Sequence, residues 1–126
     1  MDSLVEKWLD RVLMQQIPET VVALNFNLYE DAENHKSMEL VGTSRFDPED
    51  ADWACDEVFD FGTRAHPFVW QTDDPFDVAL DKMTAAVKQY LAHGSHAHIL
   101  KRYQGIGIGF VDGDIEILFY KSQDSK

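Results

Sequence analysis

Carboxylate side chains are concentrated in one short stretch of this chain, residues 47–60. The stretch holds seven acidic residues in fourteen positions and contains neither Lys nor Arg. Aromatic residues occur within and around it, and such residues often supply most of the binding energy at the centre of a protein interface. Acidic groups between aromatic ones suit a docking surface for a basic protein. The predicted contact residues are Asp47, Glu49, Asp50, Asp52, Trp53, Asp56, Glu57, Asp60 and Trp70.

The chain as a whole is also acidic. It has 126 residues, of which 23 are Asp or Glu and 11 are Lys or Arg, and its net charge is −12. Because affinity for nucleic acid rests on cationic contacts to phosphate groups, we expect no nucleic-acid partner, and an anionic lipid surface is equally unfavourable. A basic protein is attracted instead, and such steering raises association rates by roughly 10- to 10³-fold at low salt. Acidity that serves only solubility is the alternative explanation of the net charge.

Length and composition predict a single domain over residues 1–126. A chain of this size buries roughly two-thirds of its unfolded surface and needs no disulfide staples. Its one cysteine, Cys55, fits a reducing compartment, and its acidic neighbours disfavour a reactive thiolate, so we expect it to be a packed core residue. Residues 1–8 lack a signal-peptide pattern, and no apolar run reaches the roughly 20 residues of a membrane span. We therefore expect a cytoplasmic protein without a membrane partner.

Histidines and carboxylates could also bind a metal ion or perform catalysis. His93, His96 and His98 lie within six residues, but their spacing matches no structural zinc pattern, and Gly94 interrupts the helix that would align them. The acidic run 47–57 lacks the central glycine of a calcium-binding loop. We predict no catalytic residue, no metal and no cofactor. A carboxylate or histidine metal protein or enzyme remains the alternative.

Three alternating glycines, Gly105, Gly107 and Gly109, invite comparison with a dinucleotide-binding loop. The third glycine comes one residue too early for that fingerprint, and a strand rather than a helix is expected to follow. Close packing is the preferred interpretation: the glycines flatten one face of a strand, where Leu118, Tyr120 or a helix can sit. A flat face that admits a partner is the alternative, and it would suit an adaptor or oligomerising module.

Hydrophobic periodicity predicts the elements that must position these residues. Asp47 followed by Pro48 is typical of a helix start, so part of the acidic run is predicted to be a short helix near 48–54. Longer helices are predicted from apolar residues at helical spacing, and strands from alternation. The remaining predicted helices cover 3–16, 75–92 and 96–103, and the predicted strands cover 20–29, 37–46, 57–61 and 67–71.

The last hairpin gives the clearest local signal. Asp112-Gly113 is a favoured two-residue turn between two alternating strands. It predicts that Phe110 faces Ile115, Ile108 faces Ile117 and Ile106 faces Phe119. The element order predicts an α+β fold: an antiparallel sheet built from an N-terminal and a C-terminal hairpin, with helices packed on one face.

The segment between the acidic run and the helix at 75–92 has two interpretations. Its aromatic residues could form a buried cluster that closes the core, or some of them could anchor a partner. Arg64 lies close to the acidic run and is expected to pair internally with Asp60 or Glu57. The aromatic residues concerned are Phe59, Phe61, Phe68 and Trp70.

This layout resembles the small acidic immunity proteins of bacterial polymorphic-toxin systems. The resemblance is carried by the acidic-aromatic centre at 53–62, by the closing hairpin at 105–114 and by the order of the elements. It implies a compact α+β cytoplasmic domain that binds and neutralises a cognate toxin. On this basis we expect an inhibitor of a basic toxin, such as a nuclease, rather than an enzyme.

Overall fold

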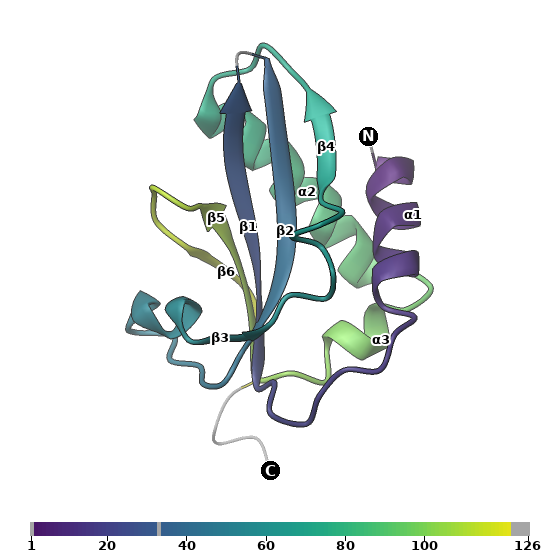
Figure 1. Cartoon of the computed structure of the whole chain (residues 1–126), viewed down its shortest axis with the longest axis vertical. Coiled ribbons are helices and arrows are strands. Elements are labelled where there is room, and N and C mark those ends of the chain that lie inside the picture. The colour runs from purple at the N-terminus through teal and green to yellow at the C-terminus, as the bar shows by residue number, and fades with distance from the viewer. Residues whose placement is uncertain (1, 33, 122–126) are drawn as a thin grey trace.

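A six-stranded sheet with helices on one face forms the centre of the molecule in the computed structural model, which describes residues 2–32 and 34–121 (Figure 1). The α+β class predicted from the sequence is confirmed. The strands are β1 (Ala23–Ala32), β2 (His35–Thr43), β3 (Glu57–Phe59), β4 (Phe68–Gln71), β5 (Gly105–Phe110) and β6 (Glu116–Tyr120). The helices are α1 (Asp2–Val12), α2 (Phe76–His93) and the short α3 (Ala97–Leu100), with a 3₁₀ turn, η1 (Ala51–Cys55), between β2 and β3.

The sheet is mixed rather than wholly antiparallel. Its strands run in the order β3-β2-β1-β5-β6, and β4 pairs with another part of β2. Each predicted hairpin is antiparallel, but β1 and β5 lie parallel, from Leu24 opposite Ile106 to Leu28 opposite Phe110. The reason is the route of the chain. Strand β4 already points in the direction of β1, and parallel strands need a crossover, which α2 supplies between β4 and β5.

The core lies between the sheet and the helices. Leu24, Phe26 and Leu28 alternate along β1 and are completely buried on the face that the helices cover. Leu9 of α1 and Met83 of α2 pack into the same cluster. The predicted helix at 75–92 agrees with α2. The other two helices end earlier than predicted, α1 at Val12 and α3 at Leu100. Within the described residues, no helix combines the length and hydrophobicity that crossing a membrane requires.

The last hairpin keeps only part of its predicted register. Ile106 pairs with Phe119 as expected, but the other predicted pairs are wrong, since Gly107 pairs with Ile117 and Ile108 with Glu116. The register shifts between Ile106 and Gly107, where Leu118 is an extra residue on the facing strand, as in a β-bulge. The tight turn predicted at Asp112-Gly113 is also displaced. Val111 instead donates its N–H to the Leu28 carbonyl of β1, at 3.0 Å.

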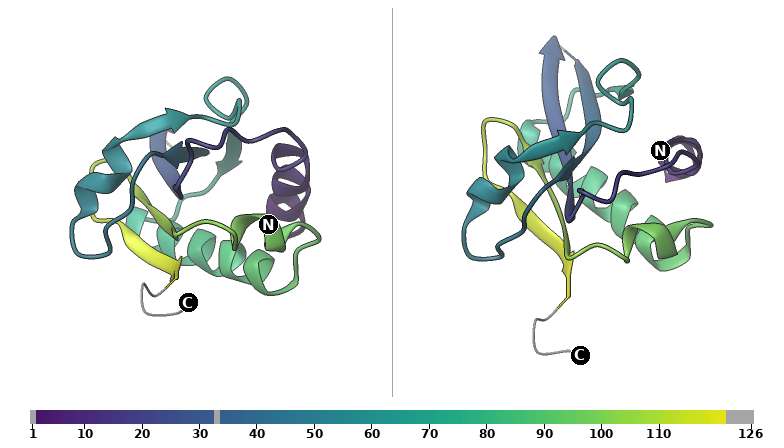
Figure 2. Two further views of the ribbon diagram at one scale, coloured as in Figure 1. Left: turned by 90° about the horizontal axis from the view of Figure 1, so that it is seen from below. Right: turned by 60° about the horizontal axis from the view of Figure 1, so that its bottom comes forward.

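The glycine face of β5 is closely packed, as predicted, but the side chains nearest to it include Phe46, Trp53 of the acidic segment (residues 47–60) and Ile115, and not Leu118, Tyr120 or a helix. A Cβ atom on Gly105 would lie 2.2 Å from the Phe46 ring, and one on Gly107 would lie 3.0 Å from the Trp53 ring. The chain from Phe46 through η1 therefore lies against β5 and β6, on the face that the long helices leave open (Figure 2). Because Gly105, Gly107 and Gly109 are all buried, the alternative prediction that this flat face admits a partner is wrong.

Replacing Gly105 with Ala tests this packing. We expect the free energy of unfolding to fall by about 1–3 kcal/mol, because the added methyl group overlaps the Phe46 ring and forces it to move. Gly113→Ala is the matched control, since its methyl group would have no heavy atom closer than 3.8 Å. Urea unfolding followed by Trp fluorescence measures both. Equal effects at the two positions would contradict the close approach of segment and strand.

Candidate functional site

Two carboxylates of the acidic segment shape its own backbone. Asp47 accepts a hydrogen bond from the Glu49 N–H at 2.9 Å, and Asp50 accepts one from the Asp52 N–H at 3.1 Å. Asp50, rather than Asp47, is therefore the N-cap of the helical turn, which is a short 3₁₀ turn. Such side-chain bonds hold the loop in one conformation. These two bonds constrain the backbone of the acidic segment around residues 47–52.

The seven predicted carboxylates fall into two groups. Asp56 forms an ion pair with Arg45, and Glu57 pairs with Arg64 at 2.7 Å, so the predicted internal pairing of Arg64 with Glu57 is confirmed. No cation in the described part of the chain lies within 4 Å of the other five carboxylates, which are Asp47, Glu49, Asp50, Asp52 and Asp60. Of these, Asp60 accepts the Gly62 N–H at 2.9 Å.

Trp53 supports the acidic segment from beneath and does not reach the surface. None of its area is exposed, and its ring packs edge-on against Phe46 with 4.9 Å between ring centroids. In this conformation it cannot contact a partner, so its predicted role as an anchor is wrong. Trp70 is half-buried on β4, where it packs against Phe68. Strands β1 and β2 separate Trp70 from the side of the sheet that carries η1, β5 and β6.

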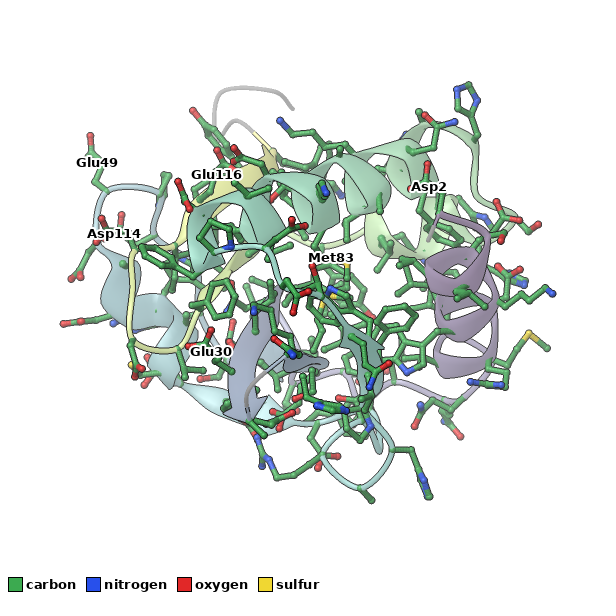
Figure 3. All side chains as sticks on the ribbon, turned by 90° about the horizontal axis from the view of Figure 1, so that it is seen from above. Asp2, Glu30, Glu49, Met83, Asp114 and Glu116 are labelled. Carbon is green, nitrogen blue, oxygen red and sulfur yellow. The ribbon has the colours of Figure 1, made fainter. Side chains whose placement is uncertain are left out.

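The structure adds three acidic residues that were not among the predicted contacts. Asp112 and Asp114 in the connection between β5 and β6, and Glu116 at the start of β6, are all exposed. This connection lies beside η1, since the Ile115 and Trp53 side chains both reach the space above Gly107. Figure 3 shows Glu49, Asp114 and Glu116 on one side of the molecule, with Asp2 on the other. We name this surface the acidic side: Glu49, Asp50, Asp52, Asp112, Asp114 and Glu116.

Asp112, Asp114 and Glu116 alternate in the sequence, in the region where a tight hairpin turn and a strand were predicted. The missing information was spatial. Only the packing of Phe46 and Trp53 on the glycine face brings the two acidic segments together. Of the acidic side, no member forms an ion pair with another described residue.

A buried carboxylate lies on the same open face of the sheet. Glu39, whose side chain is only 10% exposed, accepts hydrogen bonds from the Tyr29 hydroxyl at 3.2 Å and from Arg64 at 3.3 Å. Hydrogen bonds to Glu57 and Glu39 raise the pKa of Arg64, and burial together with the Glu39 charge raises the pKa of Tyr29. Arg64 therefore joins Glu57 of β3 to Glu39 of β2 and offsets the charge of both.

The groups that could support other chemistry are dispersed. Among residues 2–32 and 34–121, no three His, Cys, Asp or Glu side chains are placed to hold a metal ion. The rings of His96 and His98 lie 6.2 Å apart between centroids. Cys55 is exposed at the end of η1, so the prediction that it packs in the core is wrong. Comparison of the chain with family models, curated proteins and solved structures found no match.

Arg64→Met tests the role of the ion pairs around Glu39. We expect the variant to lose about 1–2 kcal/mol of stability at pH 7, because Glu39 keeps its charge in a mostly buried position without a cation. Urea unfolding at pH 7 of the wild type and the variant measures the difference.

The double variant Arg64→Met/Glu39→Gln is the control for lost packing. Removing the charge together with its partner should restore most of the stability at pH 7, since the buried charge is gone. A deficit that persists in the double variant would assign the effect of Arg64 to packing alone.

Proposed function

We propose that this protein is an acidic binding protein that captures a basic partner, as an immunity-type inhibitor of a basic toxin such as a nuclease in the cytoplasm. It acts by binding rather than by catalysis. One observation carries the proposal. Six exposed carboxylates from two segments that are distant in the sequence form the acidic side, and none forms an ion pair with a described cation.

The arrangement suits recognition because the charge is held in place before the partner arrives. The turns at Asp47 and Asp50, and the buried Trp53 beneath them, fix the backbone that carries the carboxylates. Ordering this surface on binding then costs less entropy than ordering a flexible acidic tail would. A row of carboxylates also resembles the phosphate row that a basic nuclease surface recognises, because both present a series of negative charges.

The proposed mechanism has two steps. The field of the acidic side first raises the rate of encounter with a basic surface, an effect that salt screens beyond roughly 8–10 Å. Docking then places the protein over that surface and excludes the substrate of the toxin. For a nuclease, occlusion alone is sufficient, since its substrate must reach the same cationic groups.

Neutralising one part of the acidic side tests the proposal. The triple variant Glu49→Gln/Asp50→Asn/Asp52→Asn removes three charges with little change in shape, and the new amide at position 50 keeps an oxygen for the turn. We expect association with the basic partner, identified by affinity capture from the native host, to slow by about tenfold at low salt. Stopped-flow or surface-based kinetics at two salt concentrations measure the rates, and inhibition of the captured toxin is assayed in parallel.

A matched control separates the position of the charges from their number. Asp2→Asn/Glu6→Gln/Glu19→Gln removes three exposed charges elsewhere, so both triple variants change the net charge from −12 to −9. Figure 3 shows Asp2 far from Glu49. If the two variants slow association equally, or if neither does, the acidic side is not the recognition surface.

A further inference from the structure

An aromatic pocket lies where the acidic side meets the end of the sheet. Strand β1 continues to Ala32, but its pairing with β5 ends at Leu28 and Phe110. Beyond this point, the overhanging end of β1, the β5–β6 connection and the start of α2 enclose a pocket of about 510 Å³. Its walls include Tyr29, Phe76, Phe110, Val111, Glu30 and Asp112.

The aromatic rings leave the pocket partly open to water. Phe76 and Phe110 meet edge to face, with 6.2 Å between centroids and an angle of 88°. Phe76 is nevertheless 63% exposed, and Val111 is 50% exposed. Large apolar side chains around an open hollow gain free energy when another group covers them. The ring faces also carry negative potential, which attracts cations within roughly 6 Å.

The charges around the pocket have the same sign as the ring faces. Glu30 and Asp112 line it, and Asp77 follows Phe76 at the start of α2. Glu30 is partly balanced by Lys36 at 3.3 Å, although its side chain stays 62% exposed. Asp112 is exposed and has no ion pair with a described residue. An anionic or purely apolar ligand would leave these carboxylates without compensation.

We propose that this pocket receives the side chain of a lysine or arginine presented by the basic partner. Such a side chain combines an apolar stem, which can cover Phe76 and Val111, with a cationic head that can reach Asp112 and Glu30. The inference rests on the proposed function in one respect: it takes the owner of this side chain to be the protein that the acidic side attracts. Asp112 belongs to both sites, so one partner can contact both.

Small probes test the pocket without the partner. Amide-capped arginine and lysine are titrated into the wild-type protein, followed by NMR signals of the Tyr29, Phe76 and Phe110 rings and the Val111 methyl groups. We expect saturable shifts at these residues. Capped citrulline and norleucine, the uncharged counterparts of arginine and lysine, should give much smaller shifts. Shifts from the uncharged probes that equal those from the charged ones, or no shifts from any probe, would overturn the proposal.

Two variants test whether the Phe76 side chain contributes to binding of the charged probes. Phe76→Ala should weaken binding of the charged probes about two- to fivefold, the range expected for an exposed cation–π contact. Leu4→Ala is the control, because Leu4 is similarly exposed, at 58%, and lies on α1. Both variants should keep the wild-type melting temperature to within a few degrees. Unchanged probe binding in Phe76→Ala, with the fold intact, would also overturn the proposal.

The two proposals fail separately. If the probes do not bind while the triple variant at Glu49, Asp50 and Asp52 still loses the basic partner, the pocket is refuted and the function stands. If the probes bind at Phe76 while no basic partner is captured, the pocket is supported as a site for cationic groups and the proposed function is wrong.

Discussion

The arrangement of the acidic surface depends on the absence of side chains along one face of β5. Phe46 approaches the backbone at Gly105 more closely than a Cβ atom would allow, and the Trp53 ring lies within 3.0 Å of the Cβ position at Gly107. This contact buries Trp53 completely and places η1 beside the β5–β6 connection. Asp50 and Asp52, which precede the buried Trp53, are both exposed to water. The packing of Phe46 and Trp53 on β5 thereby determines where negative charge lies on the surface.

Periodicity predicted the elements well and their assembly less well. The alternation of Leu24, Phe26 and Leu28 and the helical spacing along α2 reflect burial on one face, which the sequence records directly. The parallel contact of β1 with β5 depends instead on the path of the chain through β4 and α2, which no local pattern encodes. In the last hairpin, the turn signal at Asp112-Gly113 competes with β1, whose Leu28 carbonyl binds the Val111 N–H. That long-range bond and the bulge at Leu118 change the register beyond Ile106 and Phe119.

Composition located the acidic segment but did not show which of its charges are free. Asp56 and Glu57 are paired with Arg45 and Arg64, which lie outside the acidic run on either side of it. The role of Trp53 was equally open, since a tryptophan between acids fits either an anchor or a core residue. Trp53 is a core residue because Gly107, near the C-terminal end of the chain, leaves room for its ring. The contribution of Asp114 could not be inferred for the same reason, because its neighbours are known only after the segment has folded onto β5.

Charge and apolar contact have different consequences for a binding surface of this kind. Exposed ion pairs contribute little to affinity, typically about 0–1 kcal/mol each, and salt weakens them. A surface that used only the acidic side would associate quickly with many basic proteins and release them quickly. Discrimination requires a contact that removes water from both partners, and the pocket beside Phe76 and Asp112 is placed to provide one next to the charges. Such a pairing would make the rate of association strongly dependent on salt, whereas the lifetime of the complex would depend on salt far less.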